Sequence, residues 1–278
     1  MNKLNENHKA GDPMQLKKFF PYVLACFLFT CTNGFQATAA SPGLSPAPLP
    51  AKPKQVAFVI DDFGNNMKGT EEMLSMPVPM TIAVMPFLPS TKKDAELAYK
   101  NGHDVIVHMP MEPFKGRASW LGPGAITTDL SDEEIRSRLH KAIDEVPHAI
   151  GMNNHMGSKA TADERVMRIV MSVLKERGLF YLDSKTNHRS IAGKIAQEIG
   201  VPYTENQMFL DDSHTTEHIT KQLEIACHRL DKEQRCVVIG HVGPAGKKTA
   251  SLLRQYIPRI QKEAEFVTIS KLIFQTVN

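Results

Sequence analysis

Val56-Ala-Phe-Val-Ile-Asp-Asp-Phe-Gly64 is an apolar run that ends in two adjacent carboxylates. An apolar, β-prone run bounded by glycine is typical of a strand that is buried on both faces of a sheet. Acidic residues at the carboxyl end of such a strand lie at the mouth of an α/β fold, where enzymes of this class keep their active sites. Taken alone, Asp61 and Asp62 are more simply explained as a strand end and the cap of a following helix. Other residues have to decide between the two interpretations.

Short apolar runs alternate with segments of helical periodicity from Gln55 to the end of the chain, without a second linker or an internal repeat. Strands that alternate with helices form parallel sheets, so this order predicts an α/β fold. Seven or eight such units predict a distorted (β/α) barrel over residues 55–278, and an open doubly wound sheet is the alternative because periodicity does not report closure. The predicted strands cover residues 56–60, 80–84, 105–107, 149–152, 179–182, 201–204, 236–239 and 266–269, and the predicted helices cover about 91–101, 163–177, 191–199, 217–230 and 247–264, with one more beginning at Ser131.

The helix that begins at Ser131 has the clearest signal. Ser131 and Glu134 have the Ser-x-x-Glu spacing of a capping box. Apolar residues then follow on one helical face at Ile135, Leu139, Ala142 and Ile143. This pattern predicts an amphipathic helix that packs this face on the core.

Composition and charge describe an ordinary globular protein, with 42% hydrophobic and 23% charged residues in 278. After residue 40 the chain contains 29 Lys and Arg against 28 Asp and Glu. Because this balance provides no basic surface field, we do not expect nucleic acid as a partner.

The first 40 residues are typical of a secretory signal peptide, with Lys17-Lys18, an apolar run and an exit of small residues ending at Ala40. The apolar run, 19–31, has 13 residues. It is shorter than the ~20 that cross a bilayer. We therefore expect a periplasmic or secreted protein that is not an integral membrane protein once the signal peptide is cleaved. The alternative is an uncleaved amino-terminal anchor. Residues 41–54 contain five prolines and predict an extended linker.

Two of the four cysteines lie in the predicted leader, which leaves Cys227 and Cys236 for the mature chain. In an oxidising compartment they could form a disulfide, and two packed thiols explain them equally well.

The longest predicted connection covers residues 109–130 and contains Pro110, Pro113, the only tryptophan, Trp120, and Gly122-Pro-Gly124. Loops of this length inside a compact domain are usually functional rims or lids. We expect this loop to border the site and to influence specificity.

Polar residues of similar chemistry follow the predicted strands at the same structural position. In a barrel, the carboxyl ends of all strands meet at one mouth. A single histidine after an apolar run is more often a packed or surface residue than a ligand. Five strands with such endings, however, predict a shared site. The residues are Asp61 and Asp62 after the first strand, His108 after the third, Asn153, Asn154 and His155 after the fourth, Asp183 after the fifth, and His241 after the penultimate one.

These side chains suit metal-assisted hydrolysis. A carboxylate and two imidazoles hold a divalent ion and leave a position open for water. A second carboxylate takes the proton from the water, and a histidine held by an acid protonates the leaving amine. Asp183 and His241 are the expected acid and histidine. Asp61 and Asp62 both reach the mouth if the backbone turns at the strand end.

The same residues carry a family resemblance. From Gln55 to about Ile273 the chain resembles the NodB-type polysaccharide deacetylases, carbohydrate esterases with a distorted (β/α) barrel, and in particular their divergent YibQ-type branch. Val-Ile-Asp-Asp-Phe-Gly is similar to the family motif T-F-D-D-G, which implies that Asp61 is the general base and Asp62 a metal ligand.

Further stretches extend this resemblance. Gly102-His-Asp-Val-Ile-Val-His108 resembles the family's G-H-E-x-x-x-H, which implies that His108 is a metal ligand and His103 is structural. Tyr-Leu-Asp-Ser and Val-Ile-Gly-His resemble two later motifs, which implies that Asp183 tunes the catalytic His241.

Two positions depart from the family pattern. Glu112 stands where the second motif has its second histidine, and Asn153-Asn-His-Met-Gly157 occupies the region of the motif that supplies an arginine for the base. We infer that His155 replaces the missing metal ligand, with Glu112 as a further candidate. Asn154 or Arg189 would hold Asp61. Asn153 is a further candidate residue of the site. The alternative for Arg189 and its neighbour His188 is a solvated loop. Asp211-Asp212 could line the mouth, but an Asp pair before a helix predicted to start near Thr215 is more simply explained as its cap.

The resemblance implies a divalent ion, with zinc expected, and removal of acetyl groups from an N-acetylated, peptidoglycan-like envelope glycan. Because of the two departures, a second hypothesis is a weak or inactive metal-containing barrel that binds a glycan or an envelope protein. A third is hydrolysis of another amide or ester. The sequence does not predict an oligomeric state.

Overall fold

The computed structural model describes residues 53–275, which belong to one compact unit. The predicted leader lies outside the described residues, as does the predicted linker except for Pro53 and Lys54. Lys54 is the first residue of strand β1, one residue before the predicted start of the domain. Within residues 53–275, no helix is both long and apolar enough to cross a membrane.

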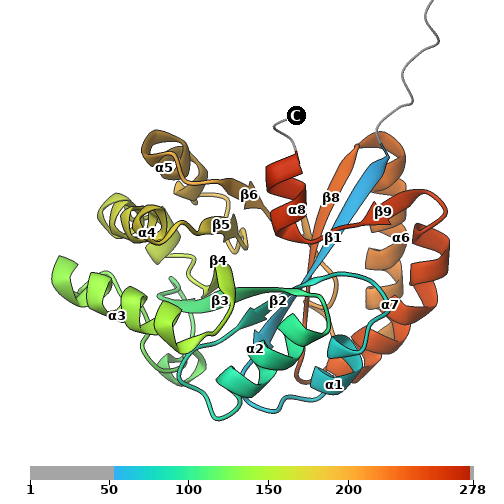
Figure 1. Ribbon diagram of the computed structural model, residues 1–278, viewed down its shortest axis with the longest axis horizontal. Coiled ribbons are helices and arrows are strands. Elements are labelled where there is room, and N and C mark those ends of the chain that lie inside the picture. The colour runs from blue at the N-terminus through green and yellow to red at the C-terminus, as the bar shows by residue number, and fades with distance from the viewer. Residues whose placement is uncertain (1–52, 276–278) are drawn as a thin grey trace, which may run out of the picture. The chain divides into compact units, whose positions relative to one another are not determined.

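Eight parallel strands follow one another around a curled sheet in the order β6-β5-β4-β3-β2-β1-β8-β7 (Figure 1). This is the cyclic order of a (β/α) barrel that is open between β6 and β7, so the predicted distorted barrel is confirmed and the doubly wound alternative is wrong. A short ninth strand pairs with the start of β1. The strands are β1 (Lys54–Phe63), β2 (Thr81–Val84), β3 (Asp104–Met111), β4 (Ala149–Met156), β5 (Phe180–Asp183), β6 (Tyr203–Glu205), β7 (Met208–Phe209), β8 (Arg235–His241) and β9 (Ala264–Phe266).

Helices follow the strands and cover the outer face of the sheet (Figure 1). The capping box predicted at Ser131 is confirmed, since Ser131 and Glu134 bond reciprocally at the start of α3. Residues 266–269, predicted as strand, instead end β9 and begin a helix at Ile269, because the Thr268 side chain caps it. The helices are α1 (Thr70–Leu74), α2 (Thr91–Lys100), α3 (Asp132–Glu145), α4 (Glu164–Arg177), α5 (Ala192–Ile199), α6 (Thr216–Lys232), α7 (Gly246–Ile260) and α8 (Ile269–Phe274), with short 3-10 helices at Ala118–Trp120 and Ala160–Ala162.

The predicted long loop is shorter and more regular than expected. β3 continues to Met111, which forms a bridge with Ile126. Backbone hydrogen bonds from Glu112 N to the Ile126 carbonyl and from Ile126 N to the Pro110 carbonyl, of 2.9 and 2.8 Å, fix this return. Residues 112–125 therefore form a rim loop with both ends attached to β3.

Two apolar cores lie on opposite faces of the sheet. The larger one packs Phe58 and Ile60 of β1 against the surrounding helices. The smaller one fills the barrel interior, where Ala57 and Val59 meet residues of β8 and of α8, the helix seen between β6 and β8 in Figure 1. Because side chains alternate along a strand, Asp61 is the next residue of β1 that points into the interior.

Cys227 on α6 and Cys236 on β8 are both buried and free. Burial raises the pKa of the Cys236 thiol to about 12, which keeps it protonated and unreactive. In this structure the two cysteines are packed thiols.

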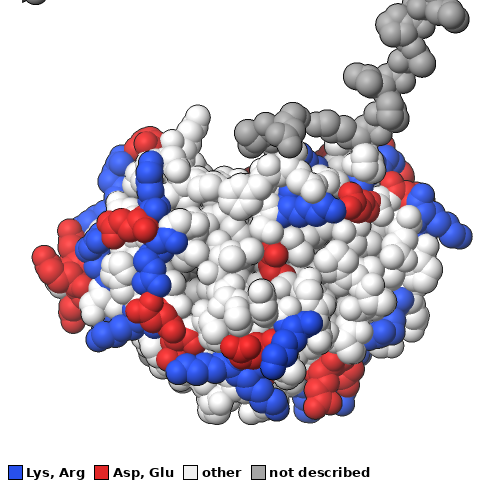
Figure 2. Space-filling view, viewed as in Figure 1, with Lys and Arg blue, Asp and Glu red and all other residues white. Residues whose placement is uncertain are grey.

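Charged residues of both signs are interspersed around the face shown in Figure 2, and few lie at its centre. This face has no single-sign patch of the kind that attracts nucleic acid.

Candidate active site

A β-bulge in β1 brings both acids of the opening motif to one cavity. The pairing of β1 with β2 shifts register between Ile60 and Phe63, and Asp62 has a left-handed backbone with φ of 71°. The extra residue turns Asp62 toward the mouth, whereas strict alternation would point it at the outer helices. Asp61 and Asp62 then line the same cavity of about 250 Å³ at the carboxyl ends of the strands.

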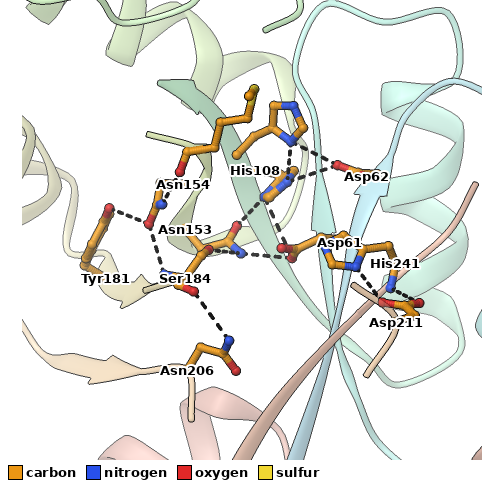
Figure 3. Close-up of polar contacts among 12 residues, drawn as sticks. Asp61, Asp62, His108, Asn153, Asn154, Tyr181, Ser184, Asn206, Asp211 and His241 are labelled. Atoms are coloured by element: carbon orange, nitrogen blue, oxygen red, sulfur yellow. Dashed lines mark hydrogen bonds and ion pairs between the residues drawn. The ribbon is translucent and has the colours of Figure 1, made fainter. Parts of the chain in front are cut away.

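Three ligand atoms converge beside this cavity. Asp62 Oδ1 lies 3.2 Å from His108 Nε2 and 3.1 Å from His155 Nδ1, and the two ring nitrogens are 3.2 Å apart (Figure 3). Asp62, His108 and His155 are the one group of acids and histidines among the described residues whose ligand atoms are close enough together to bind the same ion. The structure thus brings His155 to the place that the sequence analysis assigned to it.

Hydrogen bonds fix the tautomers of both histidines. His108 Nδ1 lies 2.8 Å from Asn153 Oδ1, and His155 Nε2 lies 3.0 Å from the Trp120 carbonyl oxygen. A carbonyl oxygen only accepts, and Asn153 uses its amide nitrogen elsewhere, so each histidine donates through these bonds. In the neutral forms of the two rings, His108 Nε2 and His155 Nδ1 therefore direct lone pairs at Asp62. Support of this kind is usual for histidines that bind metals.

The residues fit a divalent ion. Asp62 Oδ1 is buried without a satisfied hydrogen bond, and it faces two nitrogen lone pairs. With both rings neutral, three acceptors face one another, and a cation between them would relieve their repulsion. Zinc with bonds of about 2.1 Å in tetrahedral geometry has ligand atoms about 3.4 Å apart, a little more than the observed separations of 3.1 and 3.2 Å. Two imidazoles and a carboxylate are also a ligand set that zinc uses.

The two acids have opposite pKa shifts. Burial raises the pKa of Asp61, and the charges of His108 and His241 only partly oppose it. Burial also disfavours ionised Asp62, but His108 and His155, which donate hydrogen bonds to it and carry positive charge when they are protonated, outweigh burial and hold its pKa well below the ordinary value. Asp62 is thus the permanent anion, while Asp61 is the carboxylate that binds a proton more readily.

Asn153, and not Asn154 or Arg189, holds Asp61. The Asn153 amide nitrogen donates to Asp61 Oδ1 at 2.9 Å and to Ser184 Oγ at 3.2 Å. Asn154 points to the other face of β4, where its side-chain oxygen accepts from the Tyr181 hydroxyl and from the Ser184 amide (Figure 3). Arg189 lies in an exposed loop. Strand alternation along β4, counted from His155, predicts this choice.

The acid that holds His241 is Asp211, so the predicted pairing with Asp183 is wrong. Asp211 Oδ1 lies 2.7 Å from His241 Nδ1, and its Oδ2 accepts from the His241 amide and the Thr249 hydroxyl. Asp183 follows Leu182, an interior residue, and so points outward, where it accepts from Ser190 Oγ at 2.5 Å.

Asp211 was also wrongly predicted as a helix cap, because Thr215 caps α6. The inward orientation of Asp211 follows from that of Phe209, which packs on the interior core. Asp211 is two residues further and has the same inward orientation. Burial lowers the pKa of His241, but Asp211, with the charges of Asp61 and Asp62, raises it to about 9.

Glu112 is outside the ligand group. Its carboxylate accepts from the amide and hydroxyl of Thr128 at 2.8 and 2.7 Å and pairs with Lys159 at 2.8 Å. These contacts tie the rim loop to the segment after β4. Glu112 is thus a structural clamp in this structure, contrary to its prediction as a further ligand.

The polysaccharide deacetylases have this architecture: a curled parallel (β/α) barrel with an Asp-Asp motif and two histidines at its mouth, and an acid–histidine pair there that comes from later in the sequence. Residues 58–273 match the sequence model described as divergent polysaccharide deacetylase, and the chain belongs to this family.

Similar proteins include one of Haemophilus influenzae described as uncharacterized, 35% identical over 78% of this chain and 76% of its own. The uncharacterized protein YibQ of Escherichia coli is 33% identical over 88% of this chain and 75% of its own. The crystal structure of the uncharacterized protein ATU2773 from Agrobacterium tumefaciens has the same fold, with a TM-score of 0.74 and 21% identity over 81% of this chain and 91% of that chain.

Proposed function

We propose that this protein is an exported, metal-dependent hydrolase that removes acetyl groups from an N-acetylated glycan of the cell envelope. The convergence of Asp62 Oδ1 with two oriented histidine lone pairs is the observation that carries the proposal. Family membership supports the reaction class. The export signal and the glycan are inferred from the amino-terminal sequence and from the family.

Asp62, His108 and His155 would hold the ion, with zinc expected from this ligand set. A divalent ion there supplies Lewis-acid polarisation of the acyl carbonyl and lowers the pKa of water toward ~7. The ligands stay in place because Asn153 and the Trp120 carbonyl hold the far side of each ring.

Asp61 is the proposed base. It is buried beside the ligand group, and the Asn153 amide fixes its orientation. The rise in its pKa improves it as an acceptor for the proton of the attacking water.

His241 is the proposed acid. A pKa of about 9 means that it carries a proton at neutral pH. It lines the same cavity as Asp61, and Asp211 fixes its ring through Nδ1. The proton on Nε2 then faces the cavity, where it can pass to the nitrogen of the leaving amine.

Metal analysis combined with acetate release tests the proposal. The purified protein, Asp61→Asn and His155→Ala are assayed for bound zinc and for acetate released from chitooligosaccharides and peptidoglycan. We expect Asp61→Asn to keep zinc and lose acetate release by about 10²–10⁴-fold, and His155→Ala to lose zinc. His228→Ala, which removes an exposed histidine of α6, is the control.

Three outcomes would count against parts of the proposal. Full zinc occupancy in His155→Ala would remove His155 from the ligand set. A zinc-loaded wild type that releases no acetate from any glycan would favour a binding role for the barrel. Retention of the full-length chain in the cytoplasm, measured by fractionation, would contradict export.

A further inference from the structure

The rim loop presents the chain's only tryptophan to solvent beside the site. Trp120 ends the 3-10 helix Ala118–Trp120, and 57% of its surface is exposed. Its carbonyl accepts the hydrogen bond from His155, so its backbone lies directly against the ligand group. Phe114, on the same loop, is also exposed. Large exposed apolar groups at the edge of a cleft are typical of ligand-binding surfaces.

The loop that carries Trp120 is firmly held. Glu112 anchors its start, and Arg138 Nη1 donates to the Ala125 carbonyl at 2.6 Å near its end. Gly116 and Gly122 both have positive φ, and a Cβ on either would come within 2.9 Å of a methionine side chain. These contacts, together with the hydrogen bond from His155 to the Trp120 carbonyl, hold the backbone on both sides of the ring, which lowers the cost of ordering it when it binds.

The Trp120 ring lies close to Met156, one of the residues that line the catalytic cavity. A Cβ on Gly116 would meet Met156 Cε at 2.9 Å and the Trp120 ring at 3.9 Å, so both side chains flank this glycine. Met156 also lines the cavity that contains Asp61 and His241. At about 250 Å³, this cavity has room for about one sugar unit, since a cavity of ~150 Å³ already holds benzene. Neighbouring units would have to lie on the rim.

We propose that Trp120 is the platform of a subsite that binds the pyranose ring next to the acylated sugar, so that the substrate is a glycan chain and not a single sugar. This rests on the proposed function. The C–H face of a pyranose is apolar and its hydroxyls point to the side, so it can cover an indole while its polar groups stay hydrated. The Arg117 guanidinium lies over one face of the ring, 5.5 Å from its centroid, so the sugar would take the other face, and the guanidinium offers donors to hydroxyls at the edge of the ring.

Binding, measured without turnover, tests the subsite. Zinc-loaded Asp61→Asn protein is titrated by calorimetry with N-acetylated chitooligosaccharides of increasing length. We expect affinity to rise with length, Trp120→Ala in this background to remove about 10-fold of that gain, and Trp120→Phe to keep most of it. Zinc content should not change, because the backbone carbonyl that holds His155 remains.

Tyr99→Ala is the matched control. Tyr99 is also 57% exposed, but it lies in the last turn of α2, at the amino-terminal end of the barrel. This substitution should leave the affinity for every chain length unchanged.

Equal affinities of the parent and Trp120→Ala for all chain lengths would overturn the subsite and leave the proposed hydrolase intact. If the parent binds no glycan, the subsite is also wrong, and acetate release from simple N-acetylated amines then judges the hydrolase separately. Loss of binding to anionic lipid vesicles in Trp120→Ala, with glycan affinity unchanged, would assign the ring to a membrane-facing surface instead.

Discussion

Replacing Asp211 by Asn tests which acid controls the proposed catalytic histidine. Burial lowers the pKa of His241, while the hydrogen bond and charge of Asp211, with smaller contributions from Asp61 and Asp62, raise it to about 9. Asparagine keeps the size of the side chain and removes its charge. The pKa of His241 should therefore fall.

The size of the effect follows from the contacts of His241. The difference between its ordinary value of 6.5 and about 9 corresponds to about 3 kcal/mol. Solvent screens part of this interaction, because 31% of the His241 side chain is exposed. Asp61 and Asp62 also supply a share that the substitution leaves in place. We expect Asp211→Asn to lower the pKa by about 1 to 2 pH units.

NMR titration of the His241 ring in zinc-loaded protein measures this pKa directly. The pH dependence of kcat/KM gives a second readout, in which the alkaline limb should move toward neutral pH. Asp183→Asn is the control, since Asp183 bonds to Ser190 and points away from the cavity. If Asp183→Asn lowered the pKa of His241 and Asp211→Asn left it unchanged, the assignment from the structure would be refuted.

Four further predictions concern stability and positioning. The folded state binds the His241 proton more tightly than the unfolded state, so this histidine stabilises the fold below about pH 6.5, and the contribution is lost as the pH rises through about 9. The free energy of unfolding of wild type and of His241→Gln, compared at pH 6 and pH 10, measures this contribution. Asn153→Ala should reduce acetate release by about 10²-fold and weaken zinc binding by about 10-fold, measured by competition with a chelator, because it removes support from both base and ligand; Asn153→Asp, with its oxygen acceptor for His108 retained, should restore part of the zinc affinity. Glu112→Ala should lower the free energy of unfolding by about 1–3 kcal/mol with zinc content unchanged, and zinc loss in a folded variant would return Glu112 to the ligand set. Gly151→Ala should destabilise by about 1–3 kcal/mol in urea unfolding, because the new Cβ would lie 2.4 Å from the buried ring of Phe180; an unchanged midpoint would show that the barrel interior adapts.

Most of the barrel could be predicted from the sequence because each long element carries its own periodic signal. The apolar run before Asp61 and the capping box at Ser131 specify their elements through local packing and local hydrogen bonds. The short β7, of two residues, has no such signal. It is a strand only because Met208 and Phe209 pair with β8.

The candidate site divides in the same way. Residues that follow the apolar run of a long strand, such as His108 and His241, could be placed near the mouth from sequence alone, since every parallel strand of a barrel ends there. The partner of His241 could not, because Asp211 reaches it through the pairing of β7 with β8, and Asp183, the acid at the more obvious strand end, has the outward orientation. The sequence by itself thus determined which strands deliver the chemistry. Tertiary structure decided which acid meets which base, because alternation gives the direction of a side chain only relative to its own strand, whereas the face that turns inward and the strand that lies alongside depend on packing between strands.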